Sequence, residues 1–269
     1  MSDAAIGIFD SGMGGLTVLR ALLAQLPNEN FVYLGDTARL PYGTKSGETV
    51  SRYALQAAGT LMQHHVKLLV IACNTASAYA LPVLQAAIAS VPVVGVIEPG
   101  AEAACASAPN GRIAVIATEG TVNGGAYLRA IKQRDPNTSV IQKACPLFVP
   151  MAEEGLTDGE IATTVARHYL MPLKAERPDC LVLGCTHFPV LKGAICEVMG
   201  PEIAIMDSAA TTARAVKAAL TSAGLRRKET VEGARSYLVT DAVERFVRVG
   251  EIFLGAPLNP ATVELVDLR

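Results

Sequence analysis

Two cysteines follow apolar runs directly and are themselves followed by polar residues, at 69–75 (LVIACNT) and 181–187 (LVLGCTH). A thiol has an ordinary pKa of about 8.5, so it can take up or release a proton at physiological pH. Inversion of an amino acid at its α-carbon needs a base on one face and an acid on the other. Cys73 and Cys185, one from each half of the chain, fit these two roles.

The residues after each cysteine could cap a helix or hold a substrate. Asn74, Thr75 and Thr186 carry donors and acceptors suited to a carboxylate and an ammonium, although capping alone would explain each of them singly. Their shared placement favours ligand contact. His187 follows Cys185 by two residues and could polarise its thiol, although a lone histidine is usually structural. We also expect a helix to start after each cysteine and to favour the thiolate.

A glycine-rich turn follows the first apolar run, at 9–15 (FDSGMGG). It lacks the third glycine of a dinucleotide-binding loop, and the carboxylate of Asp10 would repel a phosphate there. A substrate ammonium or a thiol proton is a better partner for Asp10, while the alternative is that Asp10 or Ser11 caps a helix. Tyr42 and Gly43 are predicted to cover the site from a long loop, or else to form an ordinary turn after Pro41.

Short apolar runs alternate with helical patterns along the chain, which indicates an α/β protein with mostly parallel sheets flanked by helices. Strands are predicted at 6–10, 31–35, 68–72, 91–97, 112–117, 140–143, 180–184 and 203–206. Three segments recur in the same order at an offset of about 107 to 112 residues. The matched pairs are 6–11 with 113–118, 69–75 with 181–187, and 94–99 with 204–208. This duplication predicts two pseudo-symmetric lobes, with the active site in the cleft where the strand ends meet.

The chain after Asp207 has no partner in the repeat. It is predicted to add a helix (209–220), a strand (236–240), a helix (243–253) and a strand (263–266). We expect this segment to pack back on the first lobe. The first lobe is then discontinuous, comprising residues 1–97 and 208–269, and the second lobe comprises residues 98–207.

Composition narrows the classes of protein that the chain can represent. With 269 residues, 51% of them hydrophobic, it can bury a large core. A net charge of -2 without a dense basic stripe argues against nucleic acid as a partner. No run reaches the roughly 18 apolar residues of a membrane span, and Asp10 interrupts the only early apolar run, so we predict a cytoplasmic protein. Its six cysteines show no disulfide pattern.

Seven sequence blocks together resemble glutamate racemases, of the aspartate/glutamate racemase superfamily. The blocks are FDSGMGGLTVL (9–19), GDTARLPYG (35–43), ACNTAS (72–77), GVIEPG (95–100), IATEGTV (116–122), PLFVPMAEEG (146–155) and GCTHFPVL (184–191). The resemblance implies that Cys73 and Cys185 exchange the α-proton of L- and D-glutamate without pyridoxal phosphate or metal. It implies catalytic or substrate-binding roles for Asp10, Ser11, Tyr42, Gly43, Asn74, Thr75, Thr121, Thr186 and His187, and auxiliary roles for Asp36 and Glu153. It further implies a homodimer that supplies D-glutamate for peptidoglycan, with Cys73 acting on the D-isomer and Cys185 on the L-isomer.

Other interpretations remain open at this stage. Another small amino acid such as aspartate could be the substrate, because no motif measures the length of the substrate side chain. A zinc enzyme using Cys73, Cys185 and His187 is disfavoured by the awkward spacing of a Cys-x-His pair. A two-lobed module that binds an amino acid without catalysis is a third class. A pyridoxal phosphate racemase would need a lysine at the site, and none stands beside the predicted strand ends.

Overall fold

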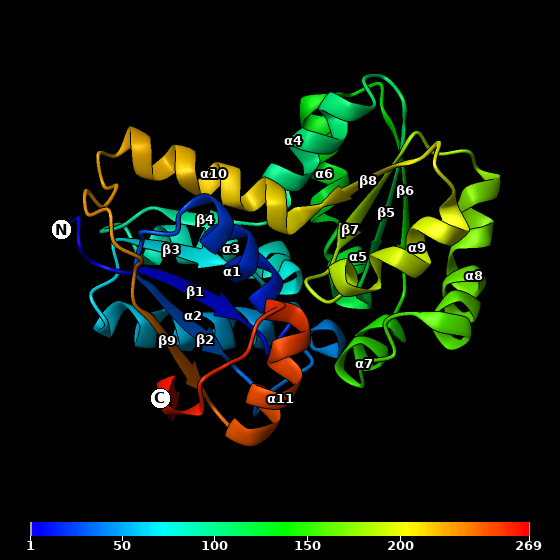
Figure 1. Cartoon of the computed structure of the whole chain (residues 1–269). Helices are drawn as coiled ribbons and strands as arrows, with labels where there is room; N and C mark the ends of the chain where they lie inside the picture. The colour runs from blue at the N-terminus through cyan, green and yellow to red at the C-terminus, as the bar shows by residue number, and fades with distance from the viewer. Residues whose placement is uncertain (1, 269) are drawn as a thin grey trace.

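Two parallel sheets organise the chain in the computed structural model, which describes residues 2–268 (Figure 1). The first sheet has the strand order β10-β9-β2-β1-β3-β4, and the second has the order β6-β5-β7-β8. The first comprises β1 (Ile6–Asp10), β2 (Phe31–Gly35), β3 (Leu68–Ile71), β4 (Val93–Gly95), β9 (Arg235–Val239) and β10 (Val263–Leu265). The second comprises β5 (Arg112–Ala117), β6 (Ser139–Ala144), β7 (Cys180–Gly184) and β8 (Ala204–Asp207). We call each sheet, with the helices packed on it, a lobe; the α/β class and the two-lobed arrangement predicted from the sequence are confirmed.

The repeat found in the sequence is also present in the structure, because four strands of each sheet follow the same order. The run β2-β1-β3-β4 in the first sheet corresponds to β6-β5-β7-β8 in the second, so that β3 and β7, which precede the two cysteines, hold equivalent positions. One predicted strand, 91–97, is too long: only Val93–Gly95 pairs, because Val96 already has helical backbone angles and caps the next helix. Domain boundaries near residues 98 and 207 stay a prediction, and they fall close to the β4–α4 and β8–α10 junctions.

Helices cover both sheets (Figure 1). Those contacting the first sheet or one another beside it are α1 (Leu16–Gln25), α2 (Gly47–Gln63), α3 (Asn74–Ala87), α10 (Ser208–Ser222) and α11 (Val243–Leu254). Those of the second lobe are α4 (Ile97–Ser107), α5 (Glu119–Gly124), α6 (Ala126–Arg134), α7 (Phe148–Glu153), α8 (Gly159–Ala175) and α9 (Lys192–Met199). Within residues 2–268, none of these helices has the length and apolarity that crossing a membrane requires.

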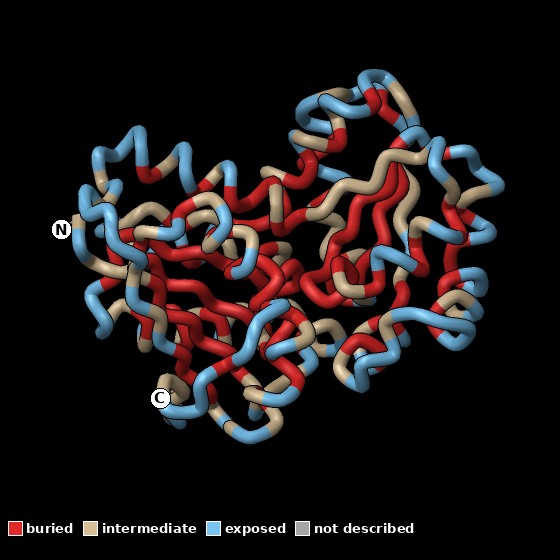
Figure 2. Tube along the Cα trace, in the orientation of Figure 1, coloured by how far each residue is buried: buried red, intermediate tan, exposed pale blue. Residues whose placement is uncertain are grey.

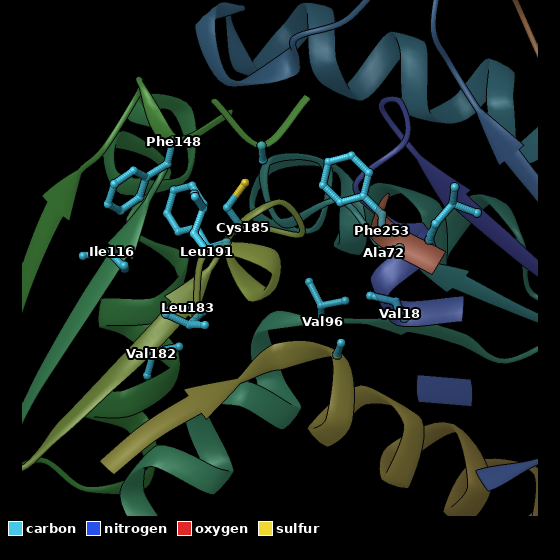
Figure 3. Packing of buried hydrophobic residues seen from close by; sticks show 14 of the residues in the cluster. Val18, Ala72, Val96, Ile116, Phe148, Val182, Leu183, Cys185, Leu191 and Phe253 are labelled. Carbon is cyan, nitrogen blue, oxygen red and sulfur yellow. The ribbon is translucent and has the colours of Figure 1, made fainter. Parts of the chain in front are cut away.

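The apolar core is continuous between the lobes. The inner strands β1, β2, β3, β5 and β7 are almost wholly buried, whereas β6, β8 and β10 at the sheet edges are not; Figure 2 shows the buried tube in red inside and the exposed tube in pale blue outside. A single cluster of buried side chains includes Val18 and Phe253 from the first lobe and Ile116 and Val182 from the second. In Figure 3 the side chain of Cys185 lies among these residues, between the Phe148 and Phe253 rings. The strand ends near Cys185 are therefore held by packing from both lobes.

Candidate active site

The carboxyl ends of strands from both sheets meet at one small cavity. Its volume, taken as the space open to the centre of a water molecule, is about 30 Å³. That is room for about two waters, since one water needs roughly 10–15 Å³ on this scale. The cavity is lined by Ser11, Pro41, Tyr42, Gly43, Cys73, Asn74, Thr75, Thr118, Val149, Cys185, Thr186 and His187. Both thiols therefore border the same enclosed space, and no lysine or arginine is among these lining residues.

A larger hollow lies elsewhere, on the outside of the first lobe. It has a volume of about 820 Å³ and runs between α2 and the strand β10, with Gln56, His64 and Glu264 in its walls. None of the residues with predicted chemistry borders it. The small cavity, where reactive groups converge and water is largely excluded, is therefore the candidate active site.

Cys73 caps the N-terminus of α3. Its Sγ accepts the backbone N–H of Ala76 at 3.4 Å and lies 3.4 Å from the Ser11 hydroxyl. Burial raises the pKa of the Cys73 thiol to about 12, and the nearby carboxyl of Asp10 adds to the rise, while the contacts with Ser11 and Ala76 oppose it. The predicted helix start is present, but desolvation outweighs its effect, so that Cys73 is held as the neutral thiol.

Cys185 has a different environment. Its Sγ lies 3.9 Å from Nδ1 of His187, and no α-helix starts directly after it, because a 3₁₀ turn (Phe188–Leu191) intervenes before α9. The prediction of a helix N-terminus at this cysteine is therefore wrong. Burial by itself would lower the pKa of His187, but the hydrogen bonds and charges of Cys185 and Glu153 outweigh it and raise that pKa to about 10. The cation beside Cys185 is thus an imidazolium rather than a helix terminus.

Asp10 lies behind the cavity wall and not in it. Its Oδ2 accepts the backbone N–H of Gly12 at 3.0 Å, and the Thr186 hydroxyl lies 3.5 Å from its Oδ1. Complete burial raises the pKa of the Asp10 carboxyl, and the charge of His187 partly offsets this. The carboxyl orients the glycine-rich turn and does not cap α1, which begins at Leu16 after Gly15.

The glycine turn brings the two lobes into close contact. A Cβ at Gly14 would lie 2.4 Å from Nδ1 of His187 and 2.5 Å from Oγ1 of Thr186, so only glycine fits there. The Thr17 hydroxyl is within hydrogen-bond distance of the carbonyl oxygens of Gly14 (2.8 Å) and Thr186 (2.9 Å). The first lobe therefore fixes the backbone beside His187.

Asn74 presents an unsatisfied donor at the cavity. Its Oδ1 accepts the Tyr127 hydroxyl at 2.8 Å, whereas its Nδ2 is buried without a hydrogen-bond partner in the described part of the chain. A buried amide without a partner costs stability and is expected to be satisfied by something that binds. A carboxylate oxygen is a suitable acceptor.

Three threonine hydroxyls join the lobes on another side of the cavity. Thr75 Oγ1 lies 2.9 Å from Thr118 Oγ1 and 3.1 Å from Thr121 Oγ1, and the latter two are 3.0 Å apart. Thr118 also caps α5. The cluster offers rotatable hydroxyls to an anionic group, although Thr121 itself stands behind the wall.

Tyr42 and Gly43 form the cavity wall through a 3₁₀ turn, but the Tyr42 hydroxyl points elsewhere. It donates to Oδ2 of Asp36, which also accepts Arg39 Nε at 2.7 Å, while Oδ1 of Asp36 accepts the Thr240 hydroxyl at 2.9 Å. Burial and the Asp36 charge raise the pKa of Tyr42 far above its ordinary value. Asp36, predicted as an auxiliary group, lies behind the wall and fixes Tyr42 in position.

Glu153, the other predicted auxiliary residue, bridges two cations. Its Oε1 lies 3.2 Å from Nε2 of His187, and its Oε2 lies 3.1 Å from Nη2 of Arg245. Burial alone would raise the pKa of Glu153, but the hydrogen bonds and charges of His187 and Arg245 outweigh it and lower that pKa. Glu153 is therefore the carboxylate that orients His187.

No three His, Cys, Asp or Glu side chains among residues 2–268 are grouped so that they could hold a metal ion. The zinc alternative thus lacks a ligand set in this part of the chain.

Comparison with known proteins identifies the family. The model of the family described as Asp/Glu/Hydantoin racemase matches residues 6–216. The chain belongs to the Asp/Glu/hydantoin racemase family. It is an isomerase, as the resemblance predicted.

Individual members of the Asp/Glu/hydantoin racemase family align with nearly the whole chain. Glutamate racemase from Geobacter metallireducens is 54% identical over 255 residues, which cover 95% of this chain and 94% of that protein. The crystal structure of glutamate racemase from Francisella tularensis in complex with D-glutamate has a TM-score of 0.93 and 36% identity, covering 100% and 99% of the two chains. The Escherichia coli glutamate racemase structure, in complex with L-glutamate and the activator UDP-MurNAc-ala, has a TM-score of 0.76 and 27% identity over 93% and 95%.

The racemase fold brings most, but not all, of the predicted residues to the cavity. Ser11, Tyr42, Gly43, Cys73, Asn74, Thr75, Cys185, Thr186 and His187 line it, whereas Asp10, Asp36, Thr121 and Glu153 stand behind. Three lining residues were not among the predicted site residues. Thr118 could have been found, because the internal repeat matches it with Ser11. No sequence pattern pointed to Pro41 or Val149 as site residues. The same holds for Arg245, which lies outside the lining and whose position depends on how the unrepeated tail packs.

Proposed function

We propose that the protein interconverts L- and D-glutamate, with Cys73 and Cys185 exchanging the α-proton from opposite faces. The observation that carries this proposal is that the two thiols border the same buried cavity and come from equivalent places in the two repeats, after β3 and after β7. A carbon atom held between two such groups can lose a proton on one face and gain one on the other.

The unequal surroundings of the thiols suggest a resting state. Cys73 keeps its proton because burial disfavours its thiolate, whereas Cys185 lies beside the His187 imidazolium. In this state Cys185, as thiolate, takes the α-proton of L-glutamate, the electron pair of the C–H bond stays on the α-carbon, and Cys73 gives its proton to the opposite face. The D-isomer then leaves with Cys73 as thiolate and Cys185 as thiol, which is the state that accepts D-glutamate.

Substrate charges match the polar groups around the cavity. Oγ1 of Thr186, oriented towards Asp10, and the Asp10 carboxyl provide negative potential for the α-ammonium. The free Nδ2 of Asn74 is suited to the α-carboxylate. The side-chain carboxylate would be held by neutral donors, the hydroxyls of Thr75 and Thr118 and the turn at Tyr42 and Gly43, since the lining has no arginine or lysine. Ser11 and Thr121 support these groups through Cys73 and Thr75.

Glutamate is preferred over aspartate as the substrate because the relatives at 44–54% identity are glutamate racemases, while an aspartate racemase from Picrophilus torridus shares only the fold at 18% identity. By the same resemblance, we infer that the chain forms a homodimer in the cytoplasm and supplies D-glutamate for peptidoglycan. Light scattering during gel filtration distinguishes a dimer from a single chain of 28.1 kDa.

The decisive test is deuterium incorporation. Purified protein is incubated with L-glutamate in heavy water containing EDTA and no added cofactor, and both enantiomers are followed. The expected product is D-glutamate with deuterium at the α-carbon. Deuterium exchange on aspartate and none on glutamate would agree with the two-cysteine chemistry but contradict the assignment of glutamate as the substrate. No exchange on either would overturn catalysis and favour a module that only binds amino acids.

A further inference from the structure

Arg245 reaches from the first lobe to the carboxylate that orients His187. It lies near the start of α11, and its Nη2 is 3.1 Å from Oε2 of Glu153 and 3.6 Å from Oε1 of Glu154. Glu153 ends α7 in the second lobe and uses its other oxygen for His187, at 3.2 Å. One carboxylate is thus held between a cation from each lobe.

Burial separates the roles of the three residues. The side chains of Glu153 and His187 are 10% and 8% exposed, whereas that of Arg245 is 40% exposed. Solvent screens an ion pair of this kind, so its effect on stability is small. Its geometry still matters, because a hydrogen bond between two charged groups is directional and Arg245 Nη2 contacts one oxygen of a carboxylate whose other oxygen faces His187.

We propose that Arg245 is a positioning residue for the reaction: it holds Glu153 against His187 and thereby completes the Cys185–His187 acid–base pair when α11 meets α7. The inference rests on the proposed racemase function. If Arg245 has this role, the reaction also depends on how the two lobes are placed. The contacts run from Cys185 through His187 and Glu153 in the second lobe to Arg245 in the first.

The charged groups around this chain of contacts are few. His187 faces Cys185, Glu153 and, at longer range, Asp10, and the Phe253 ring of α11 packs edge-on against it at 5.0 Å between centroids. Glu153 faces His187 and Arg245. The remaining acidic neighbour, Glu154, is exposed and touches only the Arg245 end. Loss of Arg245 should therefore act on His187 through Glu153.

Four variants separate positioning from general stability. Arg245→Met keeps the aliphatic stem and removes the charge, and Arg245→Lys restores a cation. Arg248→Met changes an exposed arginine on the same helix, and Glu154→Gln removes only the weaker contact. Each is measured for kcat and KM, for the pH profile of kcat/KM, and for the Nε2–H signal of His187 by NMR, which is tractable with four histidines.

Arg245→Met should lower kcat by about 10-fold with little change in KM, as loss of a group that orients a catalytic residue generally does. The pKa of Glu153 should rise without the neighbouring cation. Since a carboxylate acts above its pKa, the acidic limb of kcat/KM should then move to higher pH. The His187 Nε2–H signal should broaden through faster exchange with water. Arg245→Lys should recover most of each effect, and Arg248→Met and Glu154→Gln should match the parent protein.

The proposal would be overturned if Arg245→Met had the same kcat, the same acidic limb of the kcat/KM profile and the same His187 Nε2–H signal as the parent protein. It would also be overturned if the variant lost thermal stability but kept its kcat. If the parent protein fails to racemise glutamate, the proposed function fails, yet the NMR comparison still decides whether Arg245 positions Glu153 and His187.

Discussion

The two thiols hold equivalent places in the repeat but have different neighbours. Cys73 is a helix cap near a buried carboxyl, Asp10, and both burial and that charge keep it protonated. Cys185 follows β7, no α-helix starts directly after it, and its Sγ contacts Nδ1 of His187. The repeat thus places two thiols at matching strand ends, and the local sequence after each gives them different surroundings; in the proposed reaction they exchange the roles of acid and base with each turnover.

Replacing either thiol by serine should nearly abolish racemisation. A serine hydroxyl is a far weaker acid than a thiol, and loss of a general acid or base costs about 10²–10⁴-fold in rate. Because the two enantiomers are equal in free energy, kcat/KM must fall by the same factor in both directions. Polarimetry from each enantiomer checks this for Cys73→Ser and Cys185→Ser. Either variant turning over at the parent rate in both directions would exclude the two-cysteine mechanism.

Single-thiol variants should also reveal which face each thiol serves. Cys73→Ser keeps Cys185 and should still wash deuterium slowly into L-glutamate without inversion, while Cys185→Ser should do so with D-glutamate. Mass spectrometry of each enantiomer after incubation in heavy water measures the exchange. The opposite pairing would reverse the assignment of the faces, which the resemblance alone supplies.

His187 should make stability depend on pH in a defined window. Its pKa is raised from 6.5 to about 10 in the folded protein, so its stabilising contribution is complete below pH 6.5 and is lost as pH rises towards 10. Glu153, whose pKa is lowered, contributes above its ordinary pKa of 4.5. The difference in unfolding free energy between the parent and His187→Gln should therefore be largest near pH 5 to 6.5 and shrink towards pH 10. Urea unfolding over this range checks it, and a difference that grows with pH would contradict it.

At the level of helices and strands, the sequence was informative wherever the chain repeats itself. Apolar runs located the strands β1 to β8 to within one residue at each end, except β4, which is shorter than predicted, and the match of LVIACNT with LVLGCTH put both cysteines after equivalent strands. The functions of Asp36 and Arg245 were not accessible in this way. Asp36 faces Thr240, and Arg245 faces Glu153, through contacts of the unrepeated tail that no local pattern encodes. The 3₁₀ turn after Cys185 was missed for a related reason, because tertiary packing, not the repeat, decides how the chain leaves β7.

The glycine turn between β1 and α1 should tolerate no side chain at Gly14. An alanine Cβ would meet the His187 ring at 2.4 Å and Thr186 at 2.5 Å, so Gly14→Ala should displace His187 and lower kcat by at least about 10-fold. Gly59→Ala in the middle of α2 is the matched control, because nothing lies within 4 Å of its Cβ. The control should gain about 0.5–1 kcal/mol of stability and keep its activity. Normal kinetics in Gly14→Ala would show that the close approach is unimportant.

The whole molecule is closed around a space too small for an amino acid, so substrate entry requires the lobes or the Tyr42 turn to move. Polar contacts between the lobes beside this space include the threonine cluster on one side and the Glu153–Arg245 pair on another. The apolar core beneath them is shared, with Val18 and Phe253 packed into the same cluster as Ile116 and Val182 (Figure 3). Opening is therefore expected as a limited hinge movement in which each lobe stays folded.

A shared core also predicts that the lobes unfold together. Buried side chains of both sheets form one apolar cluster, so urea should produce one transition, with far-UV circular dichroism and tyrosine fluorescence coinciding. D-glutamate should move that whole transition to higher urea, by about 2.7 kcal/mol at a concentration 100 times its Kd, because in the proposed site it contacts both lobes and only the folded protein offers that site. Arg245→Met should unfold in the same single transition, since the substitution leaves the shared apolar core unchanged. Two separate transitions, with only one of them shifted by the ligand, would mean that the lobes are independent units and that the cleft is not bound from both sides.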